Sequence, residues 1–267
     1  MDHFKTRRQI LTAIIENYDN AGTASTTGYP RLDEAMAGGL YPSKTYILAA
    51  RKKVGKTMFM GSISRHLNEN AVPHLWLALE MNGIELEQRQ LSRDFKINPI
   101  AFLKHRETGL KDRIAAMASN GIADHVIYCD YPGIPISKLT TVIADAVEKF
   151  SIRGVIIDFM QLIGGGGADN MSVHHDAVAY TVANLAKTLN IWILAAAQLN
   201  QDHNFRGGEG ALMAADQVYH LAKTDSGSGL WIQLTESRYT PYMDIGSSES
   251  PGYYINDRGP YLEEVKI

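Results

Sequence analysis

Short apolar runs alternate with segments of helical periodicity along most of this chain, and this alternation limits the fold more than any other feature. The apolar runs occupy residues 45–50, 74–79, 126–130, 154–162 and 191–199. Helical patterns lie at residues 57–69, 83–95, 136–150 and 174–189. Strands that alternate with helices indicate βαβ units, and uninterrupted apolar strands are typical of a parallel sheet covered on both faces. The pattern predicts an α/β fold with a mostly parallel central sheet flanked by helices.

The two ends of the chain depart from this alternation. Residues 218–223, 230–237 and 253–257 are strand-like runs joined by Gly- and Ser-rich turns, which predict antiparallel hairpin strands that extend the sheet. Residues 4–18 have the pattern of an amphipathic helix, and the small polar residues 20–28 are typical of a linker. We therefore expect a linker helix and flexible link over residues 1–27, followed by one large domain over residues 28–267.

Composition excludes several classes of protein. The chain has 267 residues and a net charge of −3, so its overall charge does not favour nucleic acid, although a groove in an acidic protein can be locally basic. The single cysteine, Cys129, excludes an intramolecular disulfide and favours a cytoplasmic setting. Because no apolar run approaches the ~20 residues that a membrane span requires, we expect no membrane partner.

A phosphate-binding loop follows the first predicted strand. The pattern for such a loop is Gly, four residues, and then Gly-Lys-Ser or Gly-Lys-Thr. This chain has alanine at the first position and keeps the rest in the segment Ala50-Arg51-Lys52-Lys53-Val54-Gly55-Lys56-Thr57. In such a loop the amides at the start of the next helix point at the phosphates, Lys56 can reach the β- and γ-phosphates, and the Thr57 hydroxyl can bind Mg²⁺. The strand–loop–helix context predicts that ATP and Mg²⁺ bind here.

Three later strands end in polar residues that suit the same chemistry. Asp158 ends an apolar segment and is placed to hold Mg²⁺. Glu80 follows another such run, where it can orient or deprotonate the attacking water. Gln198 ends a third run, where a neutral amide can sense the γ-phosphate or position water. Parallel strands end at one edge of a sheet, so we expect these side chains beside the phosphate loop. The alternatives are a helix cap or surface carboxylate for Glu80 and simple turn chemistry for Gln198.

Taken together, these motifs resemble a known family. The segments that carry the resemblance are, in chain order, Thr27-Gly28-Tyr29-Pro30-Arg31-Leu32-Asp33, Gly38-Gly39-Leu40, Ala49-Ala50-Arg51 ahead of Gly55-Lys56-Thr57, Leu79-Glu80-Met81, Ile157-Asp158-Phe159-Met160-Gln161-Leu162 and Gln198-Leu199-Asn200. They are similar to the RecA-like P-loop ATPase domain of the DnaB replicative helicase family. The resemblance implies a hexameric homo-oligomer that translocates on single-stranded DNA with ATP, and a loader or a primase as further partners.

The resemblance also implies roles for individual residues. It implies Glu80 as catalytic base, Gln198 as γ-phosphate sensor, and Arg238 as the arginine finger that reaches the neighbouring subunit's ATP. It implies that the helix at residues 4–18 docks on the adjacent subunit. The DNA-facing loop of the family corresponds to residues 202–210, and its DNA-binding residues would be Arg206, Gly207 and Gly208.

Two departures from the family pattern leave alternatives open. The family commonly has a lysine two residues before the finger, where this chain has Glu236. We also expect no counterpart of the family's N-terminal domain, which contacts primase. The first alternative is a RecA-like recombinase or regulatory ATPase that does not unwind DNA. The second is a non-catalytic accessory subunit that has kept the ATP-binding fold.

Overall fold

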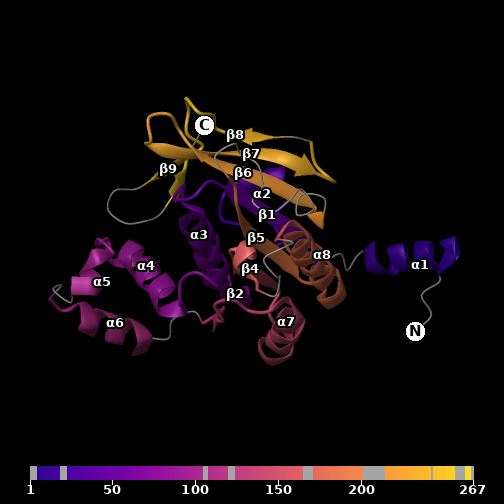
Figure 1. The fold of residues 1–267 in the computed structure, drawn as a ribbon, viewed down its shortest axis with the longest axis horizontal. Helices are drawn as coiled ribbons and strands as arrows, with labels where there is room; N and C mark the ends of the chain where they lie inside the picture. The colour runs from indigo at the N-terminus through magenta and orange to yellow at the C-terminus, as the bar shows by residue number, and fades with distance from the viewer. Residues whose placement is uncertain are drawn as a thin grey trace.

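The helices and strands that the sequence predicts occur in the predicted order, with further short elements between and after them (Figure 1). The computed structural model of the protein describes residues 5–18, 23–104, 108–119, 124–164, 171–200, 214–241, 243–255 and 262–265. Its helices are α1 (Arg7–Tyr18), α2 (Pro30–Ala35), α3 (Lys56–Glu69), α4 (Gly83–Phe95), α5 (Ile100–Lys104), α6 (Leu110–Ser119), α7 (Ile136–Phe150) and α8 (Met171–Leu189), with the 3₁₀ turn η1 (Met160–Leu162). Its strands are β1 (Thr45–Ala50), β2 (His74–Ala78), β3 (Val126–Asp130), β4 (Gly154–Asp158), β5 (Trp192–Gln198), β6 (Gln217–Lys223), β7 (Gly229–Ser237), β8 (Asp244–Ile245), β9 (Tyr253–Ile255) and β10 (Leu262–Glu264).

The strands form one sheet in the order β10-β9-β7-β6-β1-β5-β4-β2-β3, with β8 paired to β7. The six strands from β6 to β3 in this order are parallel to one another. The strands β7, β8, β9 and β10 are antiparallel to their neighbours. The predicted parallel sheet and its C-terminal hairpin extension are therefore both confirmed.

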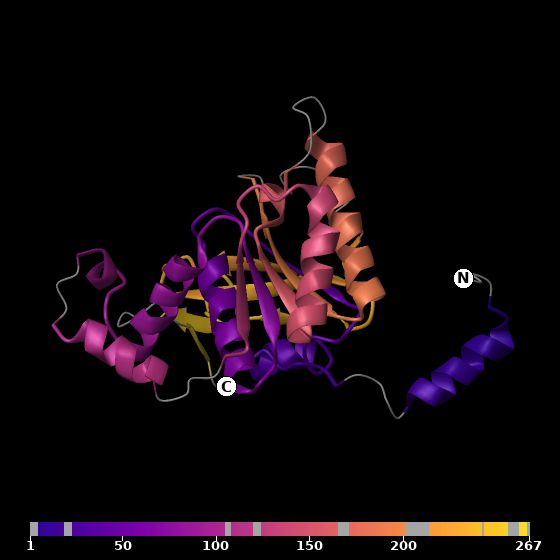
Figure 2. The ribbon, with the colours of Figure 1, turned by 90° about the horizontal axis from the view of Figure 1, so that it is seen from below.

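The two faces of the sheet carry separate hydrophobic cores, because successive side chains along a strand point to opposite faces. On β1, Ile47 and Ala49 belong to the core that packs under α7 and α8, whereas Tyr46 and Leu48 belong to the core under α2 and α3. Figure 2 shows α3 on one side of the strands and α7 and α8 on the other. Helices on both faces explain why the central strands have no polar side.

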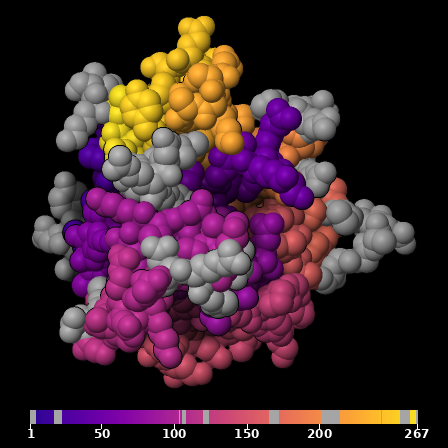
Figure 3. Space-filling model, turned by 90° about the vertical axis from the view of Figure 1, so that its left-hand side faces the viewer, coloured from indigo at the N-terminus to yellow at the C-terminus, as the bar shows by residue number. Residues whose placement is uncertain are grey.

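A helical segment, α4–α6, extends from one end of the molecule (Figures 1 and 3), where α4 contacts the edge strand β3. It has its own small hydrophobic cluster. Leu91, Phe102 and Leu110 form this cluster, and Arg113 lies 4.1 Å from the centroid of the Phe95 ring. Of these three helices, the sequence pattern predicted α4 alone. The helices α5 and α6 are short, and their apolar residues face one another rather than the sheet, so they give no long periodic signal.

Helix α1 lies apart from the sheet, at the opposite end of the molecule from α4–α6 (Figures 1 and 2). Its apolar residues are exposed, with Ile14 at 54% and Ile15 at 73% of full accessibility. Ser25 and Thr27, in the stretch expected to be a linker, are buried, and Ser25 pairs with Leu40 through two backbone hydrogen bonds. The domain boundary at residue 27 stays a prediction.

Strand β4 ends well before the residue that the sequence suggested. We expected a strand over residues 154–162, but β4 ends at Asp158 and η1 begins at Met160. Met160 and Ile163 are buried in the same core as β4, so the apolar run continues through the turn and hydrophobicity alone does not mark the end of the strand.

Among the described residues, no helix is long and apolar enough to cross a membrane.

Candidate nucleotide-binding site

The predicted polar residues meet at one edge of the sheet because the parallel strands that carry them end there. The last residue of β1, Ala50, is paired with Gln198 at the end of β5. The last residue of β2, Ala78, is paired with Asp158 at the end of β4. Glu80 follows β2 by two residues and is exposed. The sheet thus brings the ends of four strands to the start of α3.

The phosphate loop connects β1 to α3, and its geometry depends on a glycine. Gly55 caps α3 at its N-terminus with a φ of 125°, a backbone conformation that is strained for residues with a side chain. No side chain caps this end of α3. The first amide groups of a helix have no partner within the helix, and the helix dipole favours negative charge there. The loop is therefore built to accept an anion such as a phosphate group.

Lys56 lies folded over this loop. Its Nζ donates to the carbonyl oxygens of Ala50 and Arg51, at 3.2 and 3.4 Å. Burial lowers the pKa of the Lys56 ammonium, and the negative charges of Asp158 and Glu80 oppose that shift. The ammonium group therefore has carbonyl partners that a phosphate oxygen can replace, in a site that already holds opposite charge.

Asp158 is the most buried charged group at this edge, with 3% of its surface exposed. Burial raises the pKa of its carboxyl group to about 6; a hydrogen bond with the Thr57 side chain opposes the shift, and the charge of Glu80 adds to it. Its Oδ1 atom is buried and has no hydrogen-bond partner among the described residues. A buried carboxylate oxygen without a donor, next to a threonine hydroxyl, fits a hard divalent cation such as Mg²⁺.

These groups line a pocket of about 660 Å³ at the mouth of the loop. Its lining residues are Lys52, Lys53, Val54, Gly55, Lys56, Thr57, Met58, Glu80, Met81, Glu85, Arg89, Asp158, Phe159, Gln198 and Lys223. Of the predicted loop residues, Ala50 and Arg51 do not line it. Ala50 is fully buried at the end of β1, and both residues contribute their carbonyl groups to Lys56.

Two cations of the pocket, Arg89 and Lys223, were missed by the sequence reasoning. Arg89 lies on α4, one helical turn after Glu85, and its charge lowers the pKa of Asp158. Asn82 and Glu85 form a capping box that sets where α4 begins. A sequence signal for Arg89 does exist: Glu85 and Arg89 are four residues apart, so they share one face of the helix that begins just after Glu80. Lys223 ends β6 and reaches the pocket because β6 pairs with β1, which no local pattern shows.

Gln198 is held by a second glutamine. The Gln161 side chain donates to the Gln198 carbonyl and accepts from the Gln198 amide, both at 3.2 Å. This pair of bonds fixes the backbone at the end of β5 and leaves the Gln198 side chain at the pocket. Gln161 belongs to the motif after β4, so the two motifs are joined directly.

Comparison with known proteins identifies the family of this chain. A match to the family described as "DnaB-like helicase C terminal domain" covers residues 25–214. The chain belongs to this family. The Replicative DNA helicase DnaB of Geobacillus stearothermophilus is 27% identical to it over 224 residues, which are 79% of this chain and 48% of that protein. The Replicative DNA helicase DnaC of Bacillus subtilis (strain 168) is 26% identical over 207 residues, which are 73% of this chain and 45% of that protein. The chain spans about half the length of the curated relatives it matches.

Solved structures of related ATPases have the same fold. One of them, an isolated ATPase domain, superposes with a TM-score of 0.81 at 17% identity, over 98% of this chain and 100% of that one. A DnaB-like replicative helicase, solved in a study of its interactions with primase, gives a TM-score of 0.79 at 17% identity, over 99% of this chain and 68% of that one. The resemblance to the DnaB family and the RecA-like ATPase fold are therefore both confirmed.

The residue that the DnaB-like resemblance implies as a finger, Arg238, lies far from this pocket. It follows β7, which runs antiparallel to β6, with Leu230 opposite Lys223 and Ser237 opposite Gln217. Lys223 lines the pocket, so Arg238 lies at the opposite end of these two strands, roughly 25 Å from Lys223 along the strand direction at ~3.4 Å per residue. Glu236 and Arg238 are both exposed there. Arg206, Gly207 and Gly208, the predicted DNA-binding residues, lie outside the described residues.

Proposed function

We propose that this chain is an ATP-dependent DNA helicase motor, which forms a hexameric ring and translocates on single-stranded DNA. The observation that carries the proposal is the pocket in which Lys56, Thr57, Asp158, Glu80 and Gln198 converge. Membership of the DnaB-like family, whose matched relatives are named replicative DNA helicases, supports DNA unwinding as the use of the ATP energy.

Each pocket residue has a role that its surroundings support. The amides at the start of α3 and the Lys56 ammonium bind the phosphates, and Thr57 with Asp158 would hold Mg²⁺, which neutralises phosphate charge. Glu80 orients the attacking water and accepts its proton, as its exposure at the pocket rim allows. Gln198, fixed through Gln161, responds to the γ-phosphate.

The position of Arg238 supports hydrolysis between subunits. Its distance along β7 excludes it from its own pocket, and its exposed place on the surface suits a contact with a neighbouring molecule. An arginine supplied to a phosphoryl-transfer site stabilises the charge that develops on the γ-phosphate, an effect worth ~10³–10⁵ in rate. We propose that each ATP site uses Lys56 of one subunit and Arg238 of the next.

Two exposed surfaces support a ring. Helix α1 exposes Ile14 and Ile15, and α4–α6, at the opposite end of the molecule, exposes Ile84 at 71% and Ile100 at 47% (Figure 1). A contact between different surfaces on successive copies closes a ring when its rotation allows closure. We propose that α1 docks on the adjacent subunit.

Further parts of the proposal concern partners and location. Arg206, Gly207 and Gly208 are the residues we propose for contact with single-stranded DNA. A primase is one protein partner that we propose, since a DnaB-like helicase of the same fold was studied in its interactions with primase. A loader is the other partner that we propose, from the resemblance to the family alone. We propose a cytoplasmic location, which is compatible with Cys129 as a free thiol.

The test compares ATP hydrolysis, with and without single-stranded DNA, and unwinding of a forked duplex in the wild type, Lys56→Ala and Glu80→Gln. Lys56→Ala should lose nucleotide binding and hydrolysis, whereas Glu80→Gln should bind ATP and hydrolyse it ~10²–10⁴-fold more slowly. Hydrolysis without unwinding would favour a recombinase-like or regulatory ATPase. A wild type that binds ATP without hydrolysing it would favour an accessory subunit. Normal turnover in Lys56→Ala would refute the site itself.

A further inference from the structure

The turn that carries Arg238 is closed by its own hydrogen bonds. The Ser237 hydroxyl oxygen accepts from the amides of Tyr239 and Thr240, at 3.3 and 3.0 Å. The Arg238 amide donates to the carbonyl of Asp216 at 3.1 Å, which continues the pairing with the β6 side for one residue beyond β7. The backbone of Arg238 is therefore held from both sides, while its side chain is exposed.

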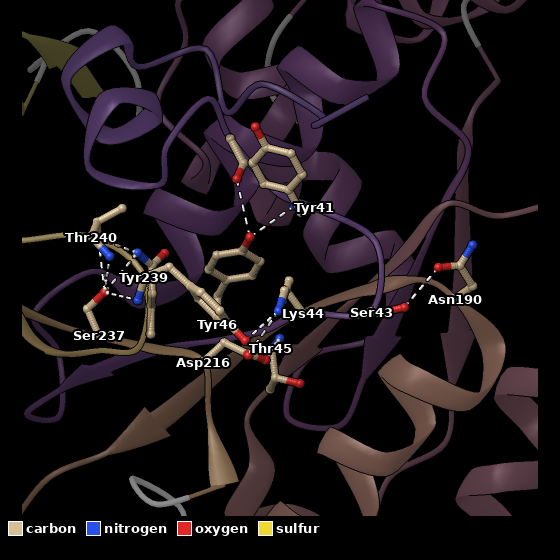
Figure 4. A network of polar contacts seen from close by, with 12 residues as sticks. Tyr41, Ser43, Lys44, Thr45, Tyr46, Asn190, Asp216, Ser237, Tyr239 and Thr240 are labelled. Carbon is tan, nitrogen blue, oxygen red and sulfur yellow. Dashed lines mark hydrogen bonds and ion pairs between the residues drawn. The ribbon is translucent and has the colours of Figure 1, made fainter. Parts of the chain in front are cut away.

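One flank of this turn is fixed by neutral groups (Figure 4). The Thr240 hydroxyl donates to the carbonyl of Ala35 at 3.0 Å. The Gln217 side-chain amide donates to Thr240 Oγ1 at 2.8 Å and to the same carbonyl at 3.1 Å. These contacts tie the turn to the end of α2 and the start of β6.

The other flank is fixed by a charged residue. Lys44 lies just before β1, and its Nζ donates to the Tyr239 hydroxyl and lies 3.8 Å from the centroid of the Tyr239 ring (Figure 4). The same Nζ is 3.6 Å from Oδ1 of Asp216, whose side chain is 3% exposed. Asp216 Oδ2 accepts from the amide of Thr45 at 2.9 Å. Lys44 and Asp216 thus connect the start of β1 to the residue that follows Arg238.

We propose that Lys44 and Asp216 are positioning residues for Arg238, acting on the ATP site of the neighbouring subunit. This inference rests on the proposed function, in which Arg238 is the finger. Tyr239 is 61% exposed, so removal of the Lys44 ammonium takes away both the hydrogen bond to its hydroxyl and the contact with its ring, and the turn loses its charged anchor. Displacement of a positioned catalytic group by about 1 Å can cost about 10²-fold in rate, although the group is still present.

The first experiment uses Lys44→Met, which keeps most of the apolar stem and removes the charge. We expect kcat for DNA-stimulated ATP hydrolysis to fall roughly 10- to 100-fold, with KM and nucleotide affinity within about threefold of wild type. Lys44→Arg should restore most of the rate, since a guanidinium group can also pair with Asp216 and lie over the Tyr239 ring. Ser43→Ala is the matched control, because Ser43 is next to Lys44 but its hydroxyl donates to Asn190, in the loop between α8 and β5, and not to the turn of Arg238. An unchanged kcat in Lys44→Met, with a lower melting temperature alone, would show a purely structural role and overturn the proposal.

A mixing experiment separates this role from damage to the phosphate loop, to which Lys44 is connected through β1. Lys44→Met protein is mixed with Lys56→Ala protein, and light scattering confirms that mixed oligomers form. Some interfaces then join an intact Lys56 to an Arg238 that is held by an intact Lys44, so activity should rise above the sum of the two separate proteins. No rise in mixed oligomers would show that Lys44 acts within its own subunit, which contradicts the proposal.

Arg238→Ala distinguishes failure of this inference from failure of the proposed function. If Arg238→Ala is inactive and Lys44→Met is fully active, Arg238 remains the finger and the positioning role is wrong. If Arg238→Ala is fully active, the finger assignment fails and the positioning role fails with it.

Discussion

Replacing the buried histidine of β2 should remove a large part of the acid sensitivity of this fold. His74 is fully buried, and its Nδ1 donates to the carbonyl of Val72 at 2.8 Å while its Nε2 contacts the Ser64 hydroxyl at 2.7 Å. Since a carbonyl only accepts, Nδ1 carries the proton, and Nε2 of the neutral ring accepts a hydrogen bond from the Ser64 hydroxyl. Burial lowers the pKa of His74 to about 4; the bond to Val72 opposes this shift, and the charge of His125 adds to it.

The size and sign of the effect follow from this pKa. Between the unfolded value of about 6.5 and the folded value of about 4, the unfolded chain binds a proton that the folded chain does not. The contribution to stability is therefore fully present above pH 6.5 and declines as the pH falls toward 4. A pKa difference of about 2.5 between the two states corresponds to roughly 3 kcal/mol of unfolding free energy.

The assay is urea unfolding of wild type and His74→Asn between about pH 4 and about pH 8, at one protein concentration. Asparagine keeps a donor for Val72 and cannot be protonated, so the difference in unfolding free energy between the two proteins should shrink by about 3 kcal/mol as the pH falls. Other groups with shifted pKa values, such as Asp158, are common to both proteins and cancel in this difference. Ser64→Ala is the control that keeps the ionisable ring. A difference that stays constant across this pH range would refute the reasoning.

Three further predictions concern the pocket and the assembly. Gly55→Ala should weaken nucleotide binding and lower the free energy of unfolding by ~1–3 kcal/mol, because φ is 125° and the added methyl group would lie 3.2 Å from Met58 Cε. An unchanged affinity in a nucleotide titration would contradict this prediction. Arg89→Gln should lower the affinity for ATP, because the pocket loses a cation. Arg93→Gln, one turn further on and outside this pocket, should not. Equal ATP affinities in the two variants would show that Arg89 does not touch the nucleotide. Ile14→Ser combined with Ile15→Ser should reduce the mass seen by light scattering, because both side chains are exposed in the single chain; an unchanged mass would exclude α1 from the interface.

The alternation of apolar runs and helical segments was enough to predict the parallel sheet, and the phosphate-loop pattern was enough to locate the pocket. Both signals are local, since the period of side chains along a strand or helix and the residues of a tight loop are written in neighbouring positions. Asp158, Glu80 and Gln198 were found for the same reason, because a polar residue after an apolar strand lies at the strand's end and parallel strands end together. The match to the DnaB-like family covers residues 25–214, and all of these motifs lie within that range.

Tertiary structure alone decided which distant residues complete the pocket and hold the turn that carries Arg238. Lys223 reaches the pocket because β6 pairs with β1, and Arg238 is at the far end of the sheet because β7 runs back along β6. Lys44 and Asp216 are far apart in the chain and meet because β1 and β6 are neighbours. Burial, which sets the pKa shifts of Lys56 and His74, likewise depends on packing from several elements at once. Strand pairing and burial are relations between residues far apart in sequence, so a local pattern cannot contain them.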